Sequence, residues 1–187
     1  MKIKVLIRFC DFLISFFLIV LTLPLFFLIL LVGYFDTGSP LFIQVRVGKN
    51  KVAFKLFKFR TMNVGTQDVA SHLSDASSIT KLGRLLRKTK LDELPQLWNV
   101  VLGDMSLVGP RPNLFNQEEL IKERHALGVY DVLPGVTGMA QVQNIDMSTP
   151  KLLAATDKKM IDNFNIKNYF RFIIMTATGS GAGDAVK

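Results

Sequence analysis

An uninterrupted apolar run at residues 12–35 limits what this chain can fold into more than any other part of it. The run contains no charged side chain and consists mainly of Leu, Ile, Phe and Val. It is long enough to cross a hydrocarbon core about 30 Å thick. We therefore predict a membrane segment, and the rest of the 187 residues is enough for one small domain.

Pro24 lies near the middle of this run, where a proline removes one helical hydrogen bond and bends the chain. Basic residues flank the run on both sides: Lys2, Lys4 and Arg8 before it, and Arg46, Lys49, Lys51, Lys55, Lys58 and Arg60 after it. The positive-inside rule assigns both flanks to the cytoplasm. This predicts a re-entrant helix in residues 1–36, broken at Pro24. Two alternatives are a spanning helix with a proline kink and a secretory signal peptide; the length of the run and the lack of a small-residue cleavage site disfavour the peptide.

The formal charge of +8 indicates an anionic partner. Nucleic acid, anionic lipid and a phosphorylated substrate would all satisfy it, and composition does not choose among them. The single cysteine, Cys10, excludes an internal disulfide and a cysteine-based zinc site. The two histidines are too far apart in sequence to show metal-ligand spacing.

Residues 41–47 and 53–60 alternate apolar and polar side chains around a Gly-Lys-Asn-Lys turn, which predicts a β-hairpin. Lys58 or Arg60, at the end of this ribbon beside the membrane, is a candidate for contact with a phosphate. A solvated basic face would give the same pattern. Residues 63–78 are polar and predict a mobile surface loop. A basic amphipathic helix from Ile79 suits a membrane surface, although a nucleic-acid helix would look similar.

Asp92 and Glu93 form an adjacent acidic pair just before an apolar helix that has Pro95 in its first turn. A carboxylate there is explained without chemistry, because it caps the helix and is stabilised by the helix dipole. The surroundings favour a site. Several cations precede the pair, and Pro110-Arg111-Pro112 presents one guanidinium rigidly for bidentate contact with a phosphate. Together they indicate a divalent metal and a phosphate in one pocket.

The remaining chain predicts an exposed helix at residues 116–127 and a glycine-rich loop leading into a short strand within residues 133–142. Gln141 in that stretch is a further site candidate. Residues 147–163 predict a helix, and residues 169–175 an interfacial or core helix too short to span a membrane. Residues 37–178 thus form one α+β domain, mostly helical with a short hairpin and membrane-surface helices. Residues 179–187 are expected to be a flexible tail without function.

These motifs, taken together, resemble the small monotopic phosphoglycosyl transferases, a bacterial sugar transferase family. The matching segments appear in family order from about residue 5 to about residue 142: SPLFIQVRVG (39–48), KFRTM (58–62), GRLLRK (83–88), LDELPQL (91–97), GDMSLVGPRP (103–112) and PGVTG (134–138). Several motifs in one order are far more specific than any one of them. The resemblance also implies a re-entrant helix, in agreement with the charge argument.

The resemblance implies transfer of a sugar 1-phosphate from a nucleotide diphosphate sugar, usually a UDP-sugar, to polyprenyl (undecaprenyl) phosphate, with Mg²⁺ as cofactor. It implies a protein of the bacterial inner membrane with its catalytic domain on the cytoplasmic face, bound to membrane lipid and not to nucleic acid. The alternative is a basic membrane-anchored module that binds anionic lipid or nucleic acid without catalysis. Binding by such a module would weaken with salt and would not depend on Asp92 or Glu93.

Residue roles follow from the same resemblance. Asp92 would be the nucleophile that forms a covalent phosphosugar intermediate, and Glu93 a metal ligand or acid/base partner. Arg111 would clamp a phosphate, with Lys58 and Arg87 as further cations near the phosphates. Asp157 matches a downstream acid of the family.

The chain departs from the family pattern at Leu23, where a small polar residue usually precedes the proline, and at Met139, where an aromatic is usual. Residues 143–146 also differ from the common pattern. They lie past the phosphate motifs, so we expect sugar or nucleotide selection there. The sugar itself is not predictable.

Overall fold

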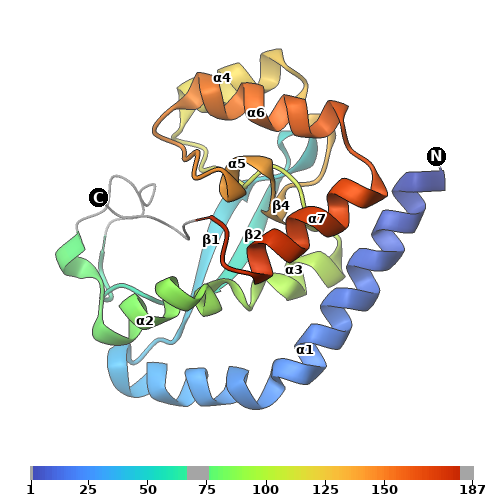
Figure 1. The fold of residues 1–187 in the computed structure, drawn as a ribbon. Helices are drawn as coiled ribbons and strands as arrows, with labels where there is room; N and C mark the ends of the chain where they lie inside the picture. Colours follow the sequence, from blue (N-terminus) through green and yellow to red (C-terminus); the bar gives the residue numbers. More distant parts are fainter. Residues whose placement is uncertain (1, 67–75, 182–187) are drawn as a thin grey trace.

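The computed structural model describes residues 2–66 and 76–181. It is an α+β fold in which a long N-terminal helix runs along a mostly helical domain that contains a β-hairpin (Figure 1). The predicted surface loop at residues 63–78 lies largely outside the described residues. Its described end forms the short 3-10 helix η3 (Ala76–Ser78), and Met62 pairs with Ile79 in an isolated bridge.

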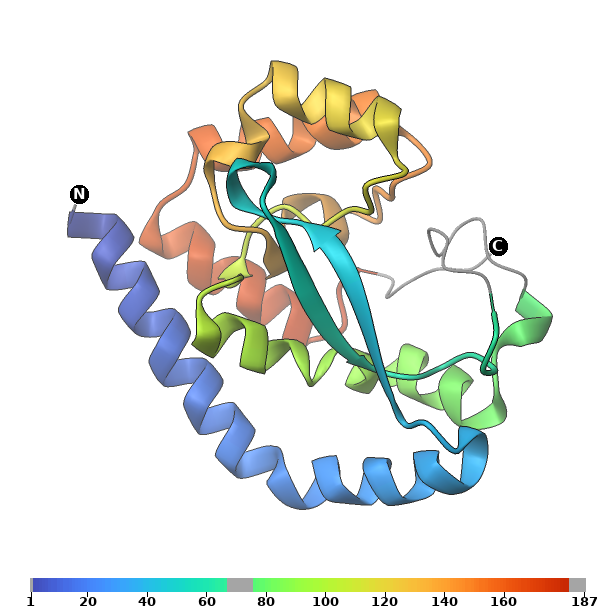
Figure 2. The same cartoon turned by 180° about the vertical axis from the view of Figure 1, so that it is seen from behind.

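Helix α1 (Lys2–Thr37) contains the whole apolar run and is long and apolar enough, by length and composition, to cross a membrane. It continues through Pro24, so the structure shows no break there. Figures 1 and 2 show instead one helix that bends partway along its length. Thr22 donates to the carbonyl of Leu18 at 2.7 Å, a side-chain bond that often bends helices. A small polar residue that bonds the helix backbone is therefore present one position before Leu23.

The first turns of α1 are bonded to the domain. Arg8 donates to the carbonyls of Val101 and Met105, each at 3.2 Å. Asp11, only 1% exposed, accepts bonds from the backbone of Leu107 at 2.9 Å and the hydroxyl of Tyr169 at 2.8 Å. Both ends of α1 therefore lie against the same domain, because its other end leads directly into the hairpin (Figure 2).

The predicted hairpin is confirmed. Strands β1 (Leu41–Val47) and β2 (Ala53–Phe59) are antiparallel, with a turn that contains η1 (Lys49–Lys51). The alternation of exposure is lost at the end of β2. Lys58 is 8% exposed and Phe59 is fully buried, packed with Ile29 of α1 and Leu86. The expectation of a solvated basic face is therefore wrong at Lys58.

Helix α2 (Lys81–Thr89) starts at Thr80, whose hydroxyl accepts from the backbone of Gly83. It ends at Lys90, which is in the left-handed conformation with φ 58°. The 3-10 turn η4 (Leu91–Glu93) and helix α3 (Gln96–Leu102) follow. Helix α3 packs against α1 and β2, which places the acidic pair at the junction of α2, β2 and α3.

A second sheet pairs β3 (Ser106–Val108) in parallel with β4 (Gly135–Thr137). Its close packing requires glycine, since a Cβ on Gly135 would lie 2.0 Å from the backbone nitrogen of Gly109. The glycine-rich stretch thus contains a strand, but earlier than expected. The end of the stretch forms helix α5 (Met139–Val142), so the strand lies near its beginning and not at its end.

The last helices complete the core. They are α4 (Glu118–Ala126), η5 (Val129–Asp131), α6 (Pro150–Asp162) and α7 (Ile166–Ala177). Helix α4 is exposed over much of its surface, as its charges predict, while Leu120 and Arg124 are buried on the face that packs on α6. Helix α7 is a core helix along one face, with Tyr169 and Phe172 buried.

The first residues of the expected flexible tail contact the rest of the domain. Lys90 donates through Nζ to the carbonyl of Ser180 at 2.7 Å. A Cβ on Gly181 would lie 2.4 Å from the carbonyl oxygen of Gln141. Residues 182–187 lie outside the described residues.

Candidate active site

The acidic pair occupies the turn η4, which precedes α3 without capping it. Helix α3 has Pro95 at its N-cap position and no side-chain cap bond, so the simple capping interpretation fails. Leu91 and Leu94, three residues apart, pack inward against Phe59 and Leu86. The turn is therefore fixed by apolar contacts on either side of the acids. Asp92 is 3% exposed, and the side chain of Glu93 is 11% exposed.

Arg111 is the cation that the fold brings to this turn from a distant part of the sequence. Its Nη2 donates to Oε1 of Glu93 in an ion pair. The Arg111 side chain keeps 22% of its surface exposed, so this guanidinium is accessible from solvent. The juxtaposition of an acidic pair and Pro-Arg-Pro that the sequence indicated is therefore present in the structure.

The main chain around Arg111 is held in place because its carbonyl groups accept hydrogen bonds from other parts of the fold. The carbonyl of Pro110 accepts from the backbone of Gly135 at 2.9 Å, and that of Pro112 accepts from Arg46 at 3.1 Å. The carbonyl of Asn113 accepts from the backbone of Val47 at 2.9 Å. The loop has no regular secondary structure, yet it is fixed to both sheets.

Lys58 and Arg60 lie at the end of the hairpin nearest α2, and both form cation–π contacts with the same aromatic ring. Nζ of Lys58 lies 5.4 Å from the ring centroid of Phe42, and Cζ of Arg60 lies 5.2 Å from it. Arg60 also donates through Nε to the carbonyl of Ser39 at 2.7 Å, which gives it a role in holding the hairpin base. A phosphate contact for either cation stays a prediction. Strand β2 does pack against η4, so Lys58 lies on an element that touches the acidic turn.

Arg87 comes from α2, the helix that leads into the acidic turn. Its Nε donates to the hydroxyl of Thr61 at 2.9 Å, which fixes the side chain between α2 and the end of β2. The three candidate cations Lys58, Arg87 and Arg111 thus come from elements that surround or contact η4.

Asp157 is not exposed to a substrate in this structure. It is 1% exposed and forms a buried ion pair with Arg124, whose Nη2 lies 2.7 Å from its Oδ2. Burial raises the pKa of the Asp157 carboxyl, and the Arg124 guanidinium opposes that shift. Arg124 was not identified from the sequence as a buried partner of Asp157, although its position in α4 indicates burial. It lies four positions after Leu120 and therefore on the same, buried face of α4.

Gln141 lies on α5, beside β4. Its Nε2 donates to the carbonyl of Val136 at 3.0 Å, while its Oε1 is buried without a hydrogen-bond partner among the described residues. Buried acceptors are nearly always bonded, so this oxygen suits a donor from water or a ligand. The prediction of Gln141 as a site residue stays open on that basis.

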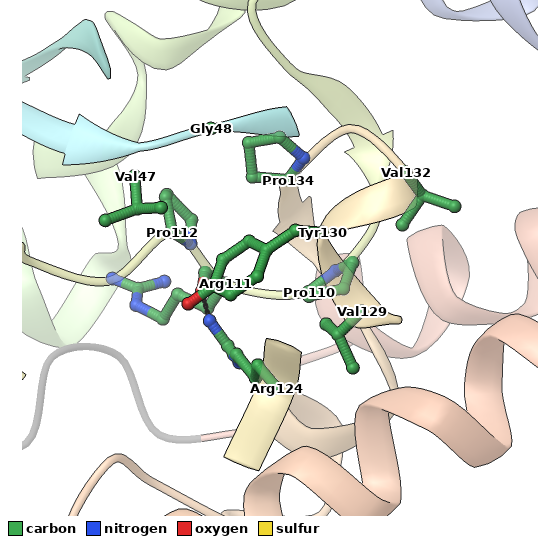
Figure 3. A pocket seen from close by; sticks show the side chains of 10 residues that line it. All are labelled: Val47, Gly48, Pro110, Arg111, Pro112, Arg124, Val129, Tyr130, Val132 and Pro134. Atoms are coloured by element: carbon green, nitrogen blue, oxygen red, sulfur yellow. Dashed lines mark hydrogen bonds between the residues drawn. The ribbon is translucent and has the colours of Figure 1, made fainter. Parts of the chain in front are cut away.

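A small hollow lies behind the Arg111 loop rather than at the acidic pair. Figure 3 shows its lining: Val47, Gly48, Pro110, Arg111, Pro112, Arg124, Val129, Tyr130, Val132 and Pro134. Its cavity volume is about 10 Å³, roughly the space that one ordered water needs and far below the roughly 300–1,000 Å³ of typical ligand pockets. Proline and valine dominate its walls. We interpret it as a gap in the packing above the Arg124 network, not as the substrate site.

The donor set of the acidic pair fits Mg²⁺. Among residues 2–66 and 76–181, no group of three or more His, Cys, Asp or Glu side chains forms a metal cage. Mg²⁺ rarely needs one, because it is commonly held by one or two carboxylates together with substrate phosphates and water. Asp92 and Glu93 supply two carboxylates in a single turn, with a cation beside them that would suit a phosphate.

The family model described as bacterial sugar transferase matches residues 3–180, and so covers both α1 and every element of the site. The chain belongs to the bacterial sugar transferase family. The motifs that resembled this family therefore identified it correctly, and the chain is an enzyme of the sugar transferase class.

Three relatives illustrate the range of this family. The sugar transferase chain is 38% identical over 174 residues to the exopolysaccharide production protein PSS of Rhizobium leguminosarum bv. phaseoli, covering 85% of this chain and 86% of the relative. It is 41% identical over 112 residues to the UDP-glucose:undecaprenyl-phosphate glucose-1-phosphate transferase of Caulobacter vibrioides, covering 58% and 42%. The UDP-N-acetylgalactosamine-undecaprenyl-phosphate N-acetylgalactosaminephosphotransferase of Aeromonas hydrophila is 33% identical over 156 residues, covering 78% and 37%.

Proposed function

We propose that this chain transfers a sugar 1-phosphate from a UDP-sugar to undecaprenyl phosphate at the cytoplasmic face of the bacterial inner membrane. The observation that carries the proposal is the pairing of Arg111 with Glu93 beside the buried Asp92, in a member of the sugar transferase family. The names of the relatives from Caulobacter and Aeromonas state this reaction with two different sugars. The sugar of this chain is accordingly left open.

In the proposed mechanism, a carboxylate oxygen of Asp92 attacks the phosphorus that carries the sugar. The bond from that phosphorus to the bridging oxygen breaks, and UMP leaves with the electron pair. An oxygen of undecaprenyl phosphate then attacks the same phosphorus and breaks its bond to Asp92. The products are the undecaprenyl diphosphate sugar and the regenerated carboxylate. Two displacements of this kind give ping-pong kinetics.

Charge neutralisation is the main task of the surrounding residues in this mechanism. A carboxylate that attacks an anionic diphosphate is repelled unless cations lie close to the phosphates. Arg111 already contacts the acidic pair, and its partly exposed side chain would exchange Glu93 for a phosphate when the donor binds. Lys58 and Arg87 are the further cations. Mg²⁺ held by Asp92 and Glu93 would neutralise phosphate charge and the leaving group.

The noncatalytic alternative, a basic module that binds anionic lipid or nucleic acid, explains the charge of +8 but not the acidic pair. Such a module has no use for two adjacent carboxylates that are mostly buried. The family match also favours the enzyme.

A donor panel tests the proposal. The full chain in lipid nanodiscs is incubated with undecaprenyl phosphate, Mg²⁺ and one of several nucleotide sugars, and nucleoside monophosphate release is measured. We expect UMP release with at least one UDP-sugar, dependent on undecaprenyl phosphate for turnover and abolished by EDTA. Restoration by added Mg²⁺ is the control. Nucleoside monophosphate release that EDTA does not reduce would contradict the metal assignment. The absence of release with every donor would contradict the function.

We also propose that α1 is re-entrant, with both ends in the cytoplasm. The support is structural: Arg8 and Asp11 bond the first turns of α1 to the domain that its other end enters. A helix that crossed the membrane would separate these ends by the thickness of the bilayer.

Cysteine labelling tests this topology. Lys4 and Lys49 are both exposed, and each is replaced by cysteine in a chain whose Cys10 is changed to alanine. We expect a membrane-impermeant maleimide to label neither position in intact cells and both in inside-out vesicles. The second cysteine is placed at Lys49 in the hairpin turn and not at Arg46, because Arg46 is buried and bonded to Pro112. Labelling of the two positions from opposite sides would restore the spanning helix.

A further inference from the structure

A buried charged network lies outside the acidic turn and is bonded to the main chain of Arg111. Arg124 is 1% exposed, and its Nη1 donates to the carbonyl of Arg111 at 2.8 Å and to Oδ1 of Asn113 at 3.0 Å. Its Nε and Nη2 donate to Oδ2 of Asp157 at 3.0 and 2.7 Å. The hydroxyl of Tyr130 completes the network with a bond to Oδ1 of Asn113 at 3.0 Å.

One guanidinium therefore connects helix α6 to the loop that presents Arg111. Figure 3 shows Arg124, Arg111 and Tyr130 together in the lining of the hollow, where Arg124 is bonded to the main chain of Arg111. A buried ion pair is weak as a source of stability, because the loss of hydration offsets much of the attraction. Its geometry, however, is highly directional. Each nitrogen of Arg124 is aimed at a particular acceptor, and one acceptor belongs to Arg111 itself.

We propose that Arg124 and Asp157 are positioning residues that fix the main chain at Arg111, so that its guanidinium reaches Glu93 and the substrate phosphate. The inference rests on the proposed function, since it assigns Arg111 to the phosphate. It also changes the role of Asp157, which the family resemblance marks as a site residue. Asp157 acts through Arg124 and the Arg111 loop, and is not a ligand of substrate or metal.

The burial of Asp157 supports this role. Asp157 lies on α6, which packs against α4, α5 and η5. Its carboxylate is almost completely covered, and one of its oxygens accepts two bonds from Arg124. The connection to the acidic pair runs through Arg124, the carbonyl of Arg111 and the Arg111 side chain.

A double-mutant cycle separates positioning from a direct role, because residues that act as one unit have effects that do not multiply. The substitution Asp157→Asn weakens the hold on Arg124 while keeping the shape of the side chain. We expect it to lower kcat roughly ten- to hundred-fold, as a misplaced catalytic group does. In a chain that already carries Arg111→Ala, we expect the same substitution to change kcat by less than about twofold.

Two further variants keep the test valid if Asp157→Asn does not fold. Tyr130→Phe removes only the hydroxyl at the edge of the network, and we expect a few-fold loss of kcat that disappears in the Arg111→Ala chain. Tyr169→Phe is the matched control, since it removes a buried hydroxyl of the same kind that donates to Asp11 and is not bonded to Arg124, Asn113 or Asp157. It should lower the thermal midpoint without a loss of kcat that depends on Arg111.

Losses that multiply in the Arg111→Ala chain would overturn the inference, because Asp157 or Tyr130 would then act independently of Arg111. A loss of kcat in Tyr169→Phe equal to that in Tyr130→Phe would also overturn it, in favour of a purely structural effect. These outcomes leave the proposed function intact. Absence of transfer by the wild-type chain would refute that function and the inference with it.

Discussion

Replacing Asp92 by asparagine is expected to abolish sugar-phosphate transfer, with a loss of at least about 10³-fold in kcat. Asparagine keeps the shape of the side chain in its buried turn, so η4 should stay folded between Leu91 and Leu94. It lacks the anionic oxygen that attacks phosphorus. The measurement is UMP release with the best donor of the panel, together with the thermal midpoint of the variant.

The matched control is Asp162→Asn, an identical change of charge at an exposed residue of α6. The side chain of Asp162 is 54% exposed and pairs with Lys158 on the same helix. We expect nearly wild-type transfer, since exposed pairs of this kind contribute little. Transfer by Asp92→Asn at a tenth of the wild-type rate or more would exclude Asp92 as the nucleophile.

Replacing Arg111 is expected to have the second largest effect. We expect Arg111→Ala to lower kcat roughly 10²- to 10³-fold, the usual cost of removing one group that stabilises developing charge. Lysine at this position keeps the positive charge but loses the planar fork that contacts a phosphate through two bonds. Arg111→Lys should therefore recover only part of the loss.

The kinetic parameters distinguish a phosphate clamp from general attraction. A group that acts mainly in the transition state lowers kcat and kcat/KM together, whereas uniform attraction changes KM alone. Lys122→Ala is the control, because Lys122 is an exposed cation on α4. We expect little effect from it at physiological salt. A rise in KM with unchanged kcat in Arg111→Ala would contradict the clamp.

Local patterns in the sequence were sufficient to predict several elements. The apolar run predicted α1, the alternation around the Gly-Lys-Asn-Lys turn predicted the hairpin, and the basic amphipathic pattern predicted α2. Each of these rests on residues that are neighbours in sequence. The proximity of the acidic pair to Arg111 was predicted only because two motifs were considered together, and the Glu93 ion pair confirms that they meet.

Contacts between distant segments were not predictable in the same way. Strands β3 and β4 are three residues each, so neither shows a useful alternation, and residues 109–134 separate them in the sequence. Arg46 and Arg124 look like surface cations, but each donates to a carbonyl of the Arg111 loop. Asp11 precedes the apolar run and gives no sign that it bonds to Tyr169. Such residues are identified by their partners, and sequence alone does not name those partners.

The proposed mechanism predicts a covalent phosphosugar on Asp92, and its detection is the most direct test. The wild-type chain is mixed with Mg²⁺ and its UDP-sugar in the absence of undecaprenyl phosphate, then quenched and analysed by intact-mass and peptide mass spectrometry. We expect a mass increase equal to one sugar phosphate on the peptide containing Asp92, absent in Asp92→Asn and lost when undecaprenyl phosphate is added. Steady turnover without any such adduct, or an adduct on a different residue, would contradict the mechanism.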